Sequence, residues 1–89
     1  MKHKYIVMQH AGEESMFVFP TVVDHDRMFE ALECIRFGEE RDWVRKYHQG
    51  QAISAGFIIN GICSGRSETL DLNSRDEIDT AIFNNQIER

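Results

Sequence analysis

The sequence predicts an α+β domain in which a four-stranded, mostly antiparallel sheet carries its helices on one face. Two short β-like runs near the N-terminus, helical spacing after Pro20 and an Asn-Gly pair between two apolar runs lead to this prediction. The expected order is strand, strand, helix, a further short helix, strand, strand, helix. No linker, repeat or low-complexity segment interrupts the 89 residues, so we treat residues 1–89 as one domain.

The first two strands are predicted over residues 5–8 and 16–19, joined as an antiparallel hairpin by a loop that contains Gly12. Pro20 ends the second strand because proline cannot donate to a strand ladder. Alternation along both runs places apolar side chains on both faces of the sheet. Two helices of the expected length cover one face, and a free apolar face is usually buried by a partner. We therefore expect a homodimer or a higher homo-oligomer.

Two helices are predicted between the hairpins. Asp24 is a good N-cap for a helix over residues 25–36, whose apolar face would consist of Met28, Ala31, Leu32 and Ile35. Residues 39–48 place acidic side chains first and basic side chains last, an order that suits the helix dipole and predicts a second short helix. Trp43 and Tyr47 lie one turn apart on it and form either a partner-binding patch or one end of the core.

The second hairpin is predicted by Asn60-Gly61, which separates the apolar runs 55–59 and 62–63. Both turn positions need positive φ angles, and Asn-Gly meets that need best. The last helix is expected to begin at Ser74 as N-cap, with Glu77 completing a capping box. Its buried face would consist of Ile78, Ala81 and Ile82.

Composition excludes some classes of protein. The net charge of −5 and the isoelectric point near 5.2 argue against a nucleic-acid binder that works by neutralising phosphates. An acidic surface instead suits solubility or a basic partner. Two cysteines in apolar settings favour a reducing compartment. We see no signal peptide and no run near ~18 apolar residues, so we expect a soluble cytoplasmic protein without a membrane partner.

The best candidate site is the polar loop 64–67 with the start of the last helix. Glycine permits unusual backbone angles, hydroxyls and amides donate, and a guanidinium binds phosphate or carboxylate in two-pronged fashion. Helix amides would add to such an anion pocket. The pattern is not a P-loop, and Asp76 and Glu77 would repel an anion at the start of the helix. The alternative to an anion site is a polar loop that simply leaves the strand before a capped helix. The candidate ligand-binding residues are Ser64, Gly65, Arg66, Ser67, Ser74, Arg75 and, where the fold brings it near, His25.

His25 lies between two carboxylates, Asp24 and Asp26, which suits a general base, a metal ligand or simply the first turn of a helix. No histidine or cysteine spacing is typical of a metal site, and we expect neither a metal nor a cofactor. A hydrolase that pairs His25 with Ser67 or Cys63 would require the fold to bring them together.

Several of these residues form a longer pattern. It comprises Phe19-Pro20, His25, Ser54-Ala55-Gly56-Phe57, Cys63, Gly65, Ser67, Leu70, Leu72 and Ser74-Arg75. In this pattern the chain resembles short phage and prophage proteins of unassigned function. It departs from them at Thr69, where serine is expected, at Asp71, where glycine is expected, and in the acid after Ser-Arg, which is displaced to Asp76 and Glu77.

The resemblance implies an accessory phage protein that acts in the cytoplasm of a bacterium against host defence. Such proteins bind a host protein or sequester a small signalling nucleotide, and they seldom catalyse reactions. Our first hypothesis is a non-enzymatic binding module for a small phosphorylated ligand. The alternatives are a protein–protein inhibitor that uses its acidic surface or Trp43 and Tyr47, and a small hydrolase.

Overall fold

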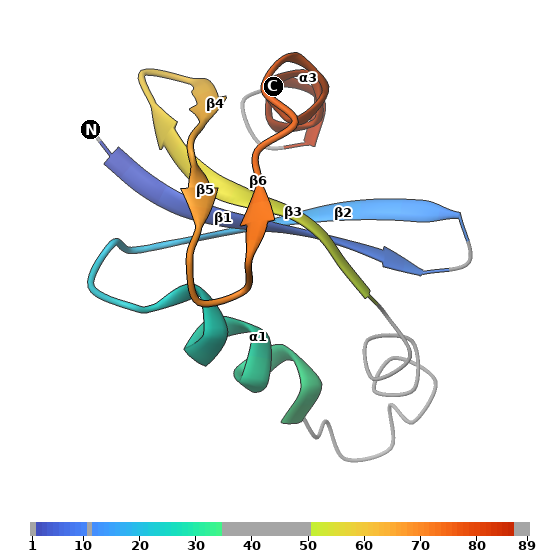
Figure 1. Cartoon of the computed structure of the whole chain (residues 1–89). Coiled ribbons are helices and arrows are strands. Elements are labelled where there is room, and N and C mark those ends of the chain that lie inside the picture. The colour runs from blue at the N-terminus through green and yellow to red at the C-terminus, as the bar shows by residue number, and fades with distance from the viewer. Residues whose placement is uncertain (1, 11, 35–50, 87–89) are drawn as a thin grey trace.

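The computed structural model describes residues 2–10, 12–34 and 51–86 (Figure 1). The elements in chain order are β1 (Lys2–His10), β2 (Glu13–Phe19), α1 (His25–Cys34), β3 (Gln51–Ile59), β4 (Ile62–Ser64), β5 (Arg66–Ser67), β6 (Leu72–Asn73) and α3 (Glu77–Gln86). The helix predicted over residues 39–48, with Trp43 and Tyr47, lies outside the described residues.

The main sheet has the order β2-β1-β3-β4, and all its neighbouring strands are antiparallel. This confirms the predicted α+β class and the four-stranded sheet. Asn60 and Gly61 both have positive φ, 53° and 80°, as the two-residue turn between β3 and β4 requires. Against β1, the register of β3 shifts after Val7, so that Ile53 is the extra residue of a bulge.

The two faces of the sheet bury separate apolar clusters. On one face, Tyr5 and Val7 of β1 pack in a cluster with Phe83 of α3. On the other, Ile6 and Met8 share a cluster with Leu32 of α1. Figure 1 shows α1 and α3 on opposite sides of the strands. The prediction that both helices lie on one face is therefore wrong. Apolar side chains of β1 alternate between the two faces of the sheet, and one helix packs on each face.

This arrangement removes the observation on which we based the expected oligomer. A helix of the same chain packs on each apolar face of the sheet, so neither face needs a second copy of the chain to bury it. The homo-oligomer remains a prediction without that support.

A second, two-stranded sheet, β5 with β6, completes the cover on the α1 side. Gly65, with φ of 85°, turns the chain out of β4 into this small hairpin. Leu70 and Leu72 of the hairpin pack against the cluster that contains Ile6. The Ser74 amide donates to the Gly65 carbonyl at 2.9 Å and closes the base of the hairpin.

Helix α1 confirms Asp24 as its N-cap, since the Asp24 carbonyl accepts the first helical bond from the Met28 amide. Its inward side differs in part from the prediction. Ala31 is exposed, and Phe29 packs against the core in its place.

Helix α3 corrects the expected capping box. The helix begins at Glu77, and the Asp76 carbonyl accepts its first bond from the Thr80 amide, so Asp76 and not Ser74 is the N-cap. The buried side chains of this helix are Asp79 and Phe83, whereas Ile78 is 57% exposed. Asp79 takes the inward position because it has hydrogen-bond partners there, Tyr5 on β1 and Arg75 just before the helix.

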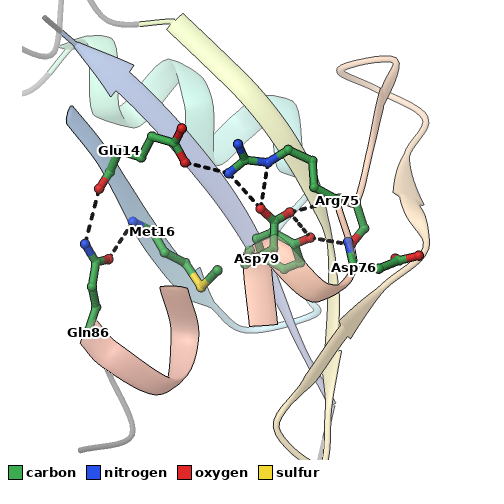
Figure 2. A network of polar contacts seen from close by, with 8 residues as sticks. Glu14, Met16, Arg75, Asp76, Asp79 and Gln86 are labelled. Atoms are coloured by element: carbon green, nitrogen blue, oxygen red, sulfur yellow. Dashed lines mark hydrogen bonds and ion pairs between the residues drawn. The ribbon is translucent and has the colours of Figure 1, made fainter. Parts of the chain in front are cut away.

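Side chains of α3 also cover both edges of the main sheet. At the β2 edge, the Gln86 amide accepts from the Met16 amide at 3.0 Å and donates to the Glu14 carbonyl at 3.2 Å (Figure 2). At the β4 edge, the Thr80 hydroxyl accepts from the Cys63 amide at 2.9 Å. Unpaired strand edges invite pairing with other chains, so these contacts protect the sheet. Among the helices described, none is long and apolar enough to span a membrane.

Candidate functional site

A cavity of about 400 Å³ lies between the start of α1 and the β5–β6 hairpin. We call it the His25 cavity. It is lined by Lys4, Asp24, His25, Phe57, Arg66, Glu68 and Thr69. The cavity therefore brings together two of the predicted site residues, His25 and Arg66, which are far apart in the sequence. Its volume falls in the range of small-molecule sites, about 300–1,000 Å³.

Strand register explains how β1 and β3 reach this cavity. Lys4 of β1 lies directly opposite Phe57 of β3 in the sheet. The Lys4 ammonium donates to the Val23 carbonyl at 3.0 Å and lies 3.8 Å from an Asp24 oxygen, so its position is fixed. Beside the cavity, the Lys2 ammonium lies 4.3 Å from the centre of the Phe57 ring, at cation–π distance.

Arg66 supplies the most adaptable cation of the cavity. Its side chain is 46% exposed, and its guanidinium pairs with Asp71, whose side chain is 89% exposed. An ion pair at this level of exposure contributes about 0–1 kcal/mol, so a ligand anion can compete for the guanidinium.

His25 is held firmly at the inner wall. Its ring makes edge-to-face contacts with Phe19 and Phe57, and only 4% of the residue is exposed. Nε2 lies 2.9 Å from the Gly56 carbonyl, which can only accept, so this nitrogen carries the proton. Burial lowers the pKa of the imidazole below its usual 6.5 and keeps it neutral at physiological pH.

The cavity also contains negative charge and a hydroxyl. The carboxylates of Asp24 and Glu68 line it together with the two cations. Thr69 accepts a hydrogen bond from the Asp26 amide at 3.2 Å, and so joins the hairpin to the first turn of α1. Because charges of both signs line one space, the site suits a ligand that has both acceptors and donors.

Two predicted site residues, Ser74 and Arg75, lie elsewhere, in a polar network around the buried Asp79 and Tyr5. Figure 2 shows Arg75 and Asp79 of this network. Arg75 donates to the Asp79 carboxylate through its backbone amide and its guanidinium, at 3.0 and 2.8 Å, and pairs with Glu14 at 2.8 Å. These contacts raise the pKa of the guanidinium and hold it away from the His25 cavity. Asp79 itself is fully buried.

Tyr5 completes this network from the central strand. Its hydroxyl donates to Asp79 at 2.6 Å and lies 2.7 Å from the Ser74 hydroxyl. Burial, reinforced by Asp79, raises the pKa of Tyr5 well above 10. Ser74 also accepts from the Asp76 amide at 2.9 Å. Both predicted ligand residues therefore anchor α3 to the sheet.

The remaining residues of the predicted loop have local structural roles. Ser64 belongs to β4, and Gly65 is the bend after it, where a Cβ would lie 3.1 Å from the Phe57 ring. Ser67 is 1% exposed, and its hydroxyl accepts from the Leu70 amide at 3.1 Å to shape the hairpin turn. Of the loop, only Arg66 lines the His25 cavity.

The structure does not bring Cys63 or the Ser67 hydroxyl into the His25 cavity, as a hydrolase would require. Cys63 belongs to the apolar cluster beneath α3, on the opposite side of the sheet from the His25 cavity. Burial raises the pKa of its thiol, which keeps it protonated and unreactive. The buried Ser67 hydroxyl is engaged in its own turn. Within the described part of the chain, no group of three or more histidine, cysteine or acidic residues could hold a metal ion.

Sequence reasoning missed Lys4, Glu68 and Thr69 as members of the cavity. Lys4 carried a weak signal, since it alternates with Ile6 and Met8 along β1 and so shares their side of the sheet. Glu68 and Thr69 had none, because nothing local shows that residues 66–73 fold back as a hairpin over α1.

No protein-family model matches the chain, and comparisons with curated proteins and with solved structures also give no match.

Proposed function

We propose that this protein is a non-catalytic binding module that holds a small phosphorylated ligand, such as a nucleotide, in the His25 cavity. The observation that supports the proposal most is the juxtaposition of Arg66 with Lys4 and His25 in one cavity. Guanidinium and ammonium groups are the usual protein partners of phosphate. The exposed Arg66 is the group that a phosphate would capture, by replacing Asp71.

The mixed charges of the cavity favour a nucleotide over a simple anion. Lys4 and Arg66 are offset by Asp24 and Glu68, so the lining has no net charge to attract bare phosphate strongly. A nucleotide adds ribose hydroxyls and base amino groups, which donate to carboxylates. The ligand would thus satisfy both signs of charge.

The environment of His25 supports binding and not catalysis. The imidazole is neutral, almost fully buried and bonded to the backbone of β3. No serine or cysteine nucleophile among the described residues lines the cavity with it. Taken with the resemblance to small phage proteins, this supports the sequestration of a signalling nucleotide of the host as the biological role.

The test is isothermal titration with AMP, GMP, CMP and UMP, with inorganic phosphate and adenosine as partial ligands. Arg66→Ala should weaken nucleotide binding by about 10- to 100-fold, the value of a hydrogen bond to a charged group. Arg27→Ala is the matched control, because Arg27 is a 75% exposed arginine of α1 in a surface ion pair. Equal affinities of Arg66→Ala and the unaltered protein, or no nucleotide binding at all, would refute the proposal.

Protein–protein inhibition remains the second candidate function. Trp43 and Tyr47, which we predicted for this role, lie outside the described residues, and the described part of the chain offers further surfaces. One such surface is the groove beside β4.

A further inference from the structure

A second hollow, of about 320 Å³, lies between β4 and α3. We call it the tip groove. It is lined by Ile62, Cys63, Asp76, Glu77, Thr80, Ala81 and Asn84. None of these residues lines the His25 cavity, so the groove is a separate site.

One exposed, large apolar side chain, Ile62, lines the β-hairpin end of this groove. Ile62 is 61% exposed, and Ile59, its partner across the hairpin, is 44% exposed. Both belong to the few large apolar side chains that the described part of the chain leaves in water. Ile59 does not line the groove, so Ile62 is the large apolar side chain that the groove offers to another molecule.

Two carboxylates form the other wall. Asp76 and Glu77 are exposed and line the groove. No lysine or arginine of the described residues pairs with either of them. Glu30 and Asp71, by contrast, are exposed acids that each pair with an arginine.

The backbone edge at the groove is already closed. The Cys63 amide donates to the Thr80 hydroxyl, so that an extended chain cannot add to β4 at this residue. A partner must therefore bind through side chains, with an apolar group beside Ile62 and Ala81 and a cation beside the two carboxylates.

We propose that the tip groove docks a short basic segment of a partner protein, in which an apolar side chain is flanked by lysine or arginine. Charge complementarity selects this occupant, because the groove lining contains two acids and no base and the whole chain has a net charge of −5. The proposal does not depend on nucleotide binding in the His25 cavity.

The test is an NMR titration of the ¹⁵N-labelled full chain with two synthetic peptides. In one, a leucine is flanked by lysines; in the other, glutamates replace the lysines. The lysine peptide should shift the amide signals of Ile62, Thr80 and Ala81 in a salt-dependent manner, and the glutamate peptide should not. Shifts located elsewhere, or equal binding of both peptides, would overturn the proposal.

Variants sharpen this test. The double variant Asp76→Asn/Glu77→Gln removes both charges, and asparagine tolerates the positive φ of 43° at position 76. It should weaken binding of the lysine peptide about tenfold. Ile62→Thr keeps a β-branched strand residue and should weaken binding of the lysine peptide by removing part of the apolar contact. Glu30→Gln on α1 is the matched control and should leave affinity unchanged. Unchanged binding in the double variant, with the fold intact by circular dichroism, would also overturn the proposal.

Discussion

Asp79 is the position at which a single substitution should destabilise this fold most clearly. Its buried carboxylate accepts from the Tyr5 hydroxyl, the Arg75 backbone amide and the Arg75 guanidinium. Asp79→Ala removes the carboxylate oxygens that accept these hydrogen bonds. It leaves the phenol with Ser74 and the guanidinium with Glu14 as their remaining partners.

The expected loss can be estimated from this geometry. Removing one partner of a buried ion pair costs about 3–5 kcal/mol, and the lower end applies because the Arg75 side chain is 26% exposed and keeps Glu14. A chain of 89 residues has a total unfolding free energy of about 4–13 kcal/mol. The variant should therefore lose a large share of its stability and melt more than about 10 °C lower.

Urea and thermal unfolding followed by circular dichroism would measure this loss. Asp79→Asn keeps the side-chain volume and one oxygen acceptor, and should fall between the alanine variant and the unaltered protein. Glu30→Ala removes a 64% exposed carboxylate and should change stability by less than about 0.5 kcal/mol. An unfolding free energy for Asp79→Ala within about 1 kcal/mol of the unaltered protein would refute the structural role of the network.

Three further outcomes are expected. Gly56→Ala would place a Cβ 2.5 Å from the Ser64 carbonyl, so unfolding experiments should show a loss of at least about 1–3 kcal/mol, and a neutral variant would contradict the packing of β3. Gln86→Ala removes the side chain that hydrogen-bonds the edge of β2, and should lower the free energy of unfolding by about 0.5–1.5 kcal/mol. Light scattering should show more self-association, because the strand edge is exposed. A variant as stable and as monodisperse as the unaltered protein would contradict this role of Gln86. The lowered pKa of His25 means that below pH 6.5 the unfolded chain takes up a proton that the folded chain refuses. The free energy of unfolding should therefore decrease as the pH is lowered below 6.5, by up to about 1.4 kcal/mol per pH unit. His25→Gln should reduce this pH dependence in urea titrations at several pH values.

Internal contacts explain much of the sequence pattern that first suggested a binding loop. Gly65 serves the bend beside Phe57, Ser67 holds the hairpin turn, and Arg75 binds Asp79. Residues chosen for their anion-binding chemistry thus have internal partners, and only Arg66 and His25 reach the cavity. A local motif shows which groups are available but not which of them another part of the chain occupies.

The sequence by itself determined the four strands of the main sheet and the two described helices, but not the small β5–β6 hairpin. Alternation along β1 and β2, Asp24 as N-cap and the Asn60-Gly61 turn are local features, because short-range sterics and hydrogen bonding decide them. The four-stranded antiparallel sheet followed from their order.

Only the tertiary structure decided what those elements cover and which residues meet. The face on which each helix packs, the inward position of Asp79 and the meeting of Lys4 with Arg66 depend on contacts between distant segments. The capping box at Ser74 was wrong for the same reason, since the Ser74 amide bonds to Gly65 and its hydroxyl contacts Tyr5. Long-range partners outweigh local preference wherever burial makes an unpaired polar group costly.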